Sequence, residues 1–393
     1  MTDQSHITAL VNGRIFDGDD MRDDCAVLLR GARILDVIAQ SDLPGDAATF
    51  ELEGQLLAPG FIDVQVNGGG GVLFNEQPTV DGIAAIANAH RRFGTTGMLP
   101  TLITDDEATI TTAAQAIIDA RRDEVPGILG VHFEGPALNT ARKGVHDASQ
   151  FRALSDQLFA LLGNEDLGER LVTLAPETLP PGTIARLVDL GVRVSVGHTA
   201  ASYEQTRAAL DEGLTGFTHL FNAMPPMESR QPGVIGAALE DRNSWCGLIV
   251  DGQHVHPATL KAAIAAKRPE RMMLVTDAMP SVGSSQKDFI LKGRRISVIG
   301  GRCTTEDGTL AGSDLDMASA VRNTVGQLGL PLDEALRMAS RYPAEFLGLA
   351  NTRGRIKPGF IADLVALDED LQVHRSWIGG DMAEHITDQG QTS

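Results

Sequence analysis

Between residues 60 and 279 the sequence repeats one pattern, a short apolar run followed by a stretch with helical periodicity. Near-continuous apolar runs are typical of parallel strands buried on both faces, and their alternation with helices indicates β/α units. Eight such units predict a parallel (β/α)8 TIM barrel of the α/β class, which takes about 250 residues. A doubly wound open sheet is the alternative, but no G-x-G-x-x-G follows the first run, so its dinucleotide-binding form has no support. The apolar runs are 60–68, 95–104, 127–136, 170–177, 193–199, 217–224, 245–252 and 271–279, and three helical segments are 80–93, 107–122 and 202–213.

Both ends of the chain have a different pattern from the middle. Residues 1–58 contain short alternating segments rich in β-branched residues and separated by Gly or Asp, and residues 350–382 have the same character. Such segments predict β-strands joined by turns. We therefore expect one small β-sandwich domain built from both termini, a catalytic barrel at 59–349, and a frayed polar tail at 383–393.

The charge of the chain limits its partners. With 33 basic and 52 acidic residues the formal net charge is −19, which argues against nucleic-acid binding through Lys and Arg patches. An anionic substrate needs a local basic pocket in such a field. The apolar runs are shorter than the ~18–20 residues that span a bilayer, and no basic segment followed by an apolar one opens the sequence. We therefore expect a cytoplasmic protein without membrane or nucleic-acid partners.

Polar side chains follow the apolar runs at the same relative position. The carboxyl ends of barrel strands meet at one face, where active sites lie. Glu134, His198 and His219 make a set of two histidines and one carboxylate, which suits a divalent metal with an open position for water. Asp277, after the eighth run, would lie across the barrel mouth as a general base. The other polar residues at these ends are Asp63, Gln65, Asn67, His132, Asn222, Asp251 and His254.

Each of these residues, taken alone, is more often a hydrogen-bonded structural group than a ligand. The metal interpretation rests on four acceptors at four strand ends, which one concave site would hold. His132 precedes Glu134 by two residues and so faces the same side of its strand. It lies deeper, where we expect it to support a ligand. Asp63 alternates with Gln65 and is expected to face inward, without an assigned role.

Five ordered motifs resemble the amidohydrolase superfamily and, more narrowly, its N-acetylglucosamine-6-phosphate deacetylases. The motifs are PGFIDVQVNG, HFEGP, VSVGHT, THLFNAM and LVTDAM, and the segments LAGSDLDM and ADLVALD fit the same family. The resemblance covers nearly the whole chain. It implies metal-dependent hydrolysis of the acetamide of N-acetyl-D-glucosamine 6-phosphate to D-glucosamine 6-phosphate and acetate, in amino-sugar catabolism.

The resemblance also implies roles for individual residues. Glu134, His198 and His219 match the family's metal ligands. Asp277 matches its catalytic acid–base, and His146 matches a histidine that helps to polarise the acetamide carbonyl.

Substrate contacts are implied in the same way. Arg230 and His254 resemble a phosphate clamp that is partly contributed by the neighbouring subunit, which implies a homodimer. The other substrate-binding positions are Val145, Asn222, Ala223, Asp251, Leu310, Ala311 and Gly312.

One departure from the superfamily concerns the end of the first run. Many amidohydrolases carry His-x-His there, which helps to hold a second metal, whereas this chain has Gln65 and Asn67. An amide is a poor zinc ligand beside imidazole and carboxylate. We therefore expect one divalent metal ion per subunit, Zn²⁺ or alternatively Fe²⁺.

Two other functions fit the same residues. One is a related amidohydrolase acting on N-acetylgalactosamine 6-phosphate or another N-acyl substrate, because Arg230 and His254 favour a phosphosugar without reading its C4 hydroxyl. The other is a non-catalytic scaffold that kept the barrel. Such scaffolds usually lose metal ligands, whereas this chain keeps the whole set and Asp277.

Overall fold

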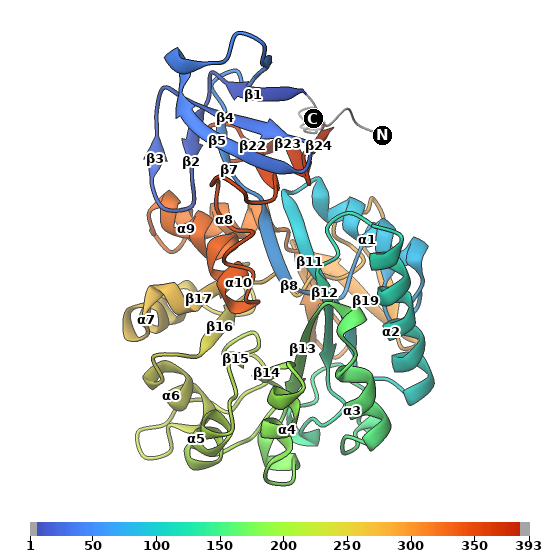
Figure 1. The fold of residues 1–393 in the computed structure, drawn as a ribbon. Helices are drawn as coiled ribbons and strands as arrows, with labels where there is room; N and C mark the ends of the chain where they lie inside the picture. The colour runs from blue at the N-terminus through green and yellow to red at the C-terminus, as the bar shows by residue number, and fades with distance from the viewer. Residues whose placement is uncertain (1–5, 386–393) are drawn as a thin grey trace. The chain divides into compact units, whose positions relative to one another are not determined.

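The computed structural model, which describes residues 6–385 of the chain, confirms the barrel. Eight strands follow one another in chain order, and neighbours from β11 to β17 pair in parallel. The sheet closes because Val66 pairs with Ala278 and the Asp277 N–H donates to the Gln65 carbonyl at 3.0 Å. The strands are β8 (Phe61–Val66), β11 (Thr95–Ile103), β12 (Gly130–Glu134), β13 (Glu169–Leu174), β14 (Arg193–Val196), β15 (Gly216–Phe217), β16 (Trp245–Leu248) and β17 (Met272–Leu274) (Figure 1).

The helices that alternate with these strands each bury one face. In α2, Ile110, Ala113 and Ile117 recur at helical spacing and are buried. The Asp106 side chain begins this helix by accepting a hydrogen bond from the Thr109 N–H at 2.7 Å. The helices α1, α2 and α5 match the three segments predicted from periodicity. The helices are α1 (Val80–Arg91), α2 (Glu107–Arg122), α3 (Asp156–Leu162), α4 (Thr183–Asp189), α5 (Tyr203–Asp211), α6 (Gly233–Glu240), α7 (Pro257–Ala266), α8 (Met317–Gly326), α9 (Leu332–Ala339) and α10 (Arg341–Phe346).

The chain divides into two compact units. One comprises residues 1–62, 90–97 and 317–393, and the other comprises residues 63–89 and 98–316. The second unit holds the carboxyl ends of all eight barrel strands. The domain boundaries expected from the sequence stay predictions. Among the helices of the described residues, none is long and apolar enough to cross a membrane.

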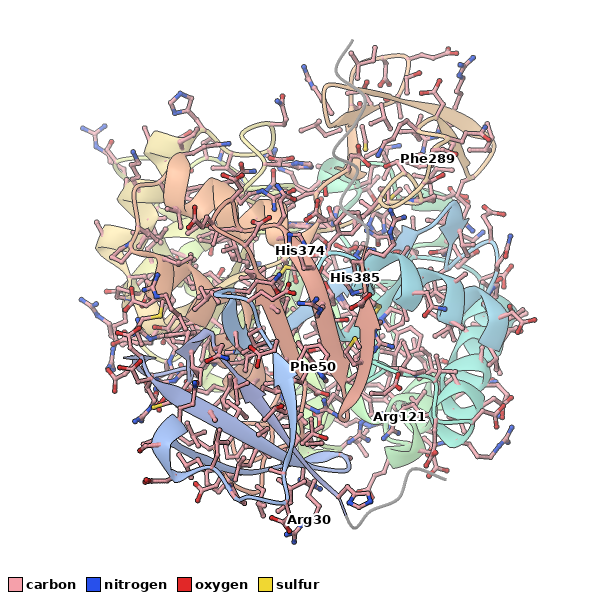
Figure 2. All side chains as sticks on the ribbon, turned by 90° about the horizontal axis from the view of Figure 1, so that it is seen from above. Arg30, Phe50, Arg121, Phe289, His374 and His385 are labelled. Carbon is pink, nitrogen blue, oxygen red and sulfur yellow. The ribbon has the colours of Figure 1, made fainter. Side chains whose placement is uncertain are left out.

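The first unit contains the predicted β-sandwich of both chain ends. Strand β22 pairs antiparallel with β7, Leu364 lying opposite Pro59, so the two ends build one sheet. Phe50 of the other sheet, labelled in Figure 2, packs edge-on against Trp377 with 5.7 Å between ring centroids. Of the predicted tail, positions 386–393 lie outside the described residues. One sheet contains β1 (Ile7–Val11), β4 (Cys25–Arg30), β5 (Arg33–Ala39) and β6 (Ala48–Glu51), and the other β2 (Arg14–Phe16), β3 (Met21–Arg22), β7 (Leu56–Pro59), β22 (Leu364–Leu367), β23 (Val373–Ile378) and β24 (Asp381–Glu384).

A further sheet in the second unit was not predicted from the sequence. It lies between β17 and α8 in the chain and has four antiparallel strands; we call it the inserted sheet. Its Leu291, Ile296 and Cys303 are buried against Ile103 and Met279 of the barrel. Figure 2 labels Phe289 at its start. The strands are β18 (Phe289–Leu291), β19 (Arg294–Ile299), β20 (Arg302–Thr304) and β21 (Leu310–Ser313), and a separate hairpin consists of β9 (Gly68–Gly69) and β10 (Val72–Leu73).

Candidate metal centre and active site

Three predicted metal ligands converge at the carboxyl ends of the barrel strands. Glu134 ends β12, and His198 and His219 follow β14 and β15. The Nε2 atoms of His198 and His219 lie 3.1 Å apart, and each lies 3.1 Å from Glu134 Oε1. Within residues 6–385 this is the one group of three His, Cys or acidic side chains whose ligand atoms all lie within 4.8 Å of one another.

The spacing and protonation of this cluster fit a divalent metal. A tetrahedral zinc ion with bonds of ~2.0–2.1 Å separates its ligand atoms by roughly 3.3 Å. His198 Nδ1 lies 2.8 Å from the Arg142 carbonyl. A carbonyl only accepts, so Nδ1 carries the proton and Nε2 turns its lone pair to the cluster. Burial alone would raise the pKa of Glu134, but the adjacent imidazoles of His198 and His219 hold it well below its usual range.

Three residues at the site have a left-handed backbone conformation, which sets the direction of their side chains. His198, His219 and Asp277 have φ angles of 48°, 33° and 54°. Residues other than glycine rarely adopt such angles, and where they do the strain often lies at an active site. Each of these residues comes directly after or near the end of its barrel strand. The turn at each strand end is therefore part of how the site is built.

Asp277 lies beside the cluster and is held by two amides. Its Oδ1 accepts hydrogen bonds from Asn67 Nδ2 at 2.6 Å and from Gln65 Nε2 at 3.1 Å. Gln65 Nε2 also lies 3.5 Å from Glu134 Oε1, so one amide spans the carboxylate and the metal ligand. Burial, and then the charge of Glu134, raise the pKa of Asp277 against the opposing effect of His219. A raised pKa suits a carboxylate that takes up and returns a proton.

His146 is a further titratable group at the cluster. Its Nε2 lies 3.8 Å from Glu134 Oε2, and its Nδ1 lies 3.0 Å from Thr104 Oγ1. Burial, and then the charge of His198, lower the pKa of His146 to about 3. The ring is therefore neutral at physiological pH, and any hydrogen bond that it donates comes from a neutral imidazole.

His132 lies beneath the cluster and does not join it. Its Nδ1 and Nε2 lie 3.3 Å from Thr101 Oγ1 and 2.7 Å from Thr173 Oγ1. Burial lowers the pKa of His132 to about 4. His132 therefore contacts no predicted ligand directly. It reaches the neighbourhood of His219 through Thr173, whose Oγ1 also lies 2.6 Å from the hydroxyl of Thr218, the residue before His219.

Asp63 faces inward, as predicted, and the structure shows what it binds. It accepts hydrogen bonds from Thr276 Oγ1 at 2.5 Å, from the Thr276 N–H at 3.3 Å and from the Gln65 N–H at 3.1 Å. Burial raises its pKa to about 7. Asp63 therefore ties together the two strand ends that carry Gln65 and Asp277. Sequence reasoning missed this role, because only the barrel closure brings the two strands together.

A cavity of about 490 Å³ opens over the cluster of Glu134, His198 and His219, called the metal cluster below because these side chains are the predicted metal ligands. Asp251 is not among its lining residues, but accepts a hydrogen bond from His254 Nδ1 at 2.6 Å. Ala311 is buried in the apolar cluster under the inserted sheet. Arg230 lines a separate cavity of about 470 Å³. Of the predicted substrate contacts, the residues that line the cavity over the cluster are Val145, Asn222, Ala223, His254, Leu310 and Gly312.

A single chain therefore does not bring Arg230 to the metal cluster, and its expected place at the neighbouring subunit's site stays a prediction. Sequence reasoning missed two other cationic residues, Arg142 and Arg302, which line the cavity over the cluster. Arg142 is close to the HFEGP motif and could have been noticed there. Arg302 follows a pair of glycines in a segment without a motif.

The chain forms a closed (β/α)8 barrel. Its strand ends carry two histidines and a carboxylate beside a buried aspartate, which is the arrangement of a metal-dependent hydrolase. Comparison with known families agrees. Residues 56–388 match the Amidohydrolase family, and residues 8–57 match the NagA composite domain. The chain belongs to the amidohydrolase family.

Individual relatives are similar over nearly their whole length. The chain is 43% identical to an N-acetylgalactosamine-6-phosphate deacetylase of Shewanella sp. (strain ANA-3), over 94% of each chain. It is 34% identical to an N-acetylglucosamine-6-phosphate deacetylase of Haemophilus influenzae, over 96% of this chain and 99% of the relative. The crystal structure of N-acetylglucosamine-6-phosphate deacetylase from Pasteurella multocida superposes with a TM-score of 0.93 at 34% identity, over 96% and 100% of the two chains.

Proposed function

We propose that this protein hydrolyses the acetamide of N-acetyl-D-glucosamine 6-phosphate to D-glucosamine 6-phosphate and acetate, as a step of amino-sugar catabolism. The observation that carries this proposal is the placement of Asp277. Its carboxylate is held by Asn67 and Gln65 beside the cluster of Glu134 and the two histidines, under an open cavity. The relatives and the solved structure named above support the same reaction.

The chemistry follows from the residues around the cluster. A divalent ion held by Glu134, His198 and His219 would supply an activated water, since such ions lower the pKa of bound water from 15.7 towards ~7. Asp277 accepts the proton of that water as the acetyl carbon is attacked. It then gives the proton to the sugar nitrogen, because this nitrogen cannot leave as an anion. We also propose that His146 helps to polarise the carbonyl oxygen as its negative charge develops.

We propose one metal ion per subunit, Zn²⁺ or alternatively Fe²⁺, on Glu134, His198 and His219. The support comes from Gln65 and Asn67, whose NH₂ groups point at Asp277. An amide whose NH₂ group donates to a carboxylate holds that carboxylate in position. These two residues therefore hold the base where other amidohydrolases hold a second metal.

The substrate's phosphate is proposed to bind to His254 and to Arg230 of a second subunit in a homodimer. His254 lines the cavity, and Asp251 accepts its Nδ1 proton, which leaves Nε2 for a ligand. Since a sugar phosphate is a dianion that does not cross a bilayer unaided, we also propose that the enzyme works in the cytoplasm.

A second candidate substrate is the C4 epimer, N-acetylgalactosamine 6-phosphate. The specific observation is the identity of 43% to the Shewanella relative with that activity in its name, against 34% to the Haemophilus relative named for the glucosamine sugar. Both substrates require the same cluster, the same Asp277 and a phosphate site. They differ only in the direction of one hydroxyl group.

One assay tests both candidates. Acetate release should be followed with purified enzyme on each 6-phosphorylated epimer and on each unphosphorylated sugar, before and after treatment with a chelator. We expect turnover of the 6-phosphates that the chelator abolishes and that added Zn²⁺ restores. A preference for the galactosamine sugar in kcat/KM would replace the first candidate by the second. Absence of acetate release from both, with the metal bound, would contradict the proposed function.

A further inference from the structure

The inserted sheet presents one arginine to the catalytic cavity. Arg302 begins β20, and the next residue, Cys303, is wholly buried in the apolar cluster between this sheet and the barrel. Successive residues of a strand face opposite sides. Cys303 therefore anchors the strand, while Arg302 is exposed on its other side and lines the cavity over the metal cluster.

Backbone pairing sets the position of Arg302 relative to the reacting groups. Arg302 lies opposite Ser313 in the pairing of β20 with β21. Ser313 pairs in turn with Ala278, and its N–H donates to the Asp277 carbonyl at 2.9 Å. Two inter-strand spacings of about 4.8 Å thus place the backbone of Arg302 about 10 Å from that of Ala278. At that distance the Arg302 side chain can contact a sugar bound in the cavity.

Arg302 differs from the other arginines of the inserted sheet in its partners. Its neighbours are engaged: Arg294 donates to the Val145 carbonyl at 2.9 Å, and Arg295 pairs with Asp288 at 2.7 Å. For the Arg302 guanidinium no hydrogen-bond or ion-pair partner is found among residues 6–385. A free guanidinium in a cavity of a chain with a net charge of −19 is a site for an anion, and its planar fork matches phosphate oxygens bidentately.

We propose that Arg302 binds the 6-phosphate of the substrate from within the same chain. This inference rests on the proposed function, which supplies the phosphate. The acetamide is on C2 of the sugar and the phosphate is on C6, on the other side of the ring. The backbone of Arg142, the other arginine that lines this cavity, lies next to the reacting centre, because its carbonyl accepts the His198 Nδ1 proton. Of the two arginines, Arg302 is therefore the one that we assign to the phosphate on C6.

The test compares Arg302→Gln with Arg302→Lys and with the control Arg295→Gln. The control removes a charge from the same sheet, at a residue that is paired with Asp288 and does not line the catalytic cavity. In the metal-loaded enzyme, Arg302→Gln should raise KM for the 6-phosphorylated sugar about 10-fold or more, with kcat little changed. KM for the unphosphorylated sugar should stay the same. Arg302→Lys should be intermediate, and the control should match the wild type.

A second readout does not depend on turnover. Inorganic phosphate should raise the melting temperature of the wild-type metal-loaded protein and of Arg295→Gln, and should raise it less in Arg302→Gln. If Arg302→Gln keeps both the phosphate shift and the KM ratio of the two sugars, the inference is wrong. An equal loss on both sugars would also overturn it, because that result indicates a structural effect. If the wild type hydrolyses neither hexosamine phosphate, the proposed function fails, and the phosphate shift still decides on Arg302.

Discussion

Replacing Asp277 by Asn removes the proton acceptor and keeps the shape of the side chain. The two hydrogen bonds to its side chain both go to Oδ1, from Asn67 and Gln65. In Asp277→Asn the amide oxygen can keep both of them, while the NH₂ group faces the cavity. The backbone bonds to the Gln65 carbonyl and from the Ser313 N–H do not involve the side chain. We therefore expect the fold and the metal cluster to persist.

The expected fall in kcat follows from the two proposed roles of the Asp277 carboxylate. A general acid or base typically contributes 10² to 10⁴-fold, and Asp277 acts first as base and then as acid. We expect kcat to fall by about 10³ or more, which corresponds to roughly 4 kcal/mol on the activation barrier. Stability should not fall, because burial and the charge of Glu134 already disfavour the ionised carboxyl of Asp277.

Three measurements on one preparation test this reasoning. Acetate release gives kcat, elemental analysis gives the metal content, and thermal unfolding gives the stability. A variant with bound metal and a nearly normal kcat would refute the role of Asp277, and the base would then be sought at His146 or His254. A variant that loses the metal would show instead that Asp277 is a ligand.

Three further outcomes are expected. Elemental analysis of the purified protein should find about one tightly bound divalent ion per chain, because Gln65 and Asn67 donate to a carboxylate; two ions would contradict this. Arg230→Ala should mainly raise KM for the 6-phosphorylated sugar and narrow its advantage over the unphosphorylated one; an unchanged advantage would mean that Arg230 does not bind the phosphate. Thr104→Val should lower kcat about 10-fold with metal retained, while Thr104→Ser should not, because the Thr104 hydroxyl, which donates to the Glu134 carbonyl at 3.0 Å, lies 3.0 Å from His146 Nδ1 and so holds this ring in place. Equal activity of the two Thr104 variants would show that this contact does not matter.

The barrel and its cluster could be predicted because both depend on local patterns. Apolar runs of strand length mark the strands, and parallel strands bring their carboxyl ends to one face whatever the loops do. Glu134, His198 and His219 could thus be grouped without knowledge of any distance. Asp277 joined them for the same reason. The β-sandwich was visible because its two halves have the same alternation, although residues far apart in the chain, such as Leu364 and Pro59, form its sheet.

The partners of the site residues could not be predicted, because they depend on barrel closure. Asp277 meets Asn67 and Gln65 only where the last strand returns to the first. The sequence suggested Gln65 and Asn67 as replaced metal ligands. Their observed contacts, in which both NH₂ groups donate to the Asp277 carboxylate, depend on which way each amide points, and no spacing rule specifies that.

The inserted sheet was missed because strands of three to six residues leave too short a pattern, yet it shapes the site from two directions. Arg294 donates to the Val145 carbonyl, so the sheet holds the segment that carries His146, and Lys292 forms an ion pair with Asp105 after β11. The same sheet presents Arg302 to the cavity. The metal ligands and the base that we propose lie at the strand ends of the barrel, whereas Arg302, which we propose as a further phosphate contact beside His254 and Arg230, belongs to an addition to the barrel. Substitutions in such an addition can change which phosphorylated sugar is bound while the metal and the base stay in place.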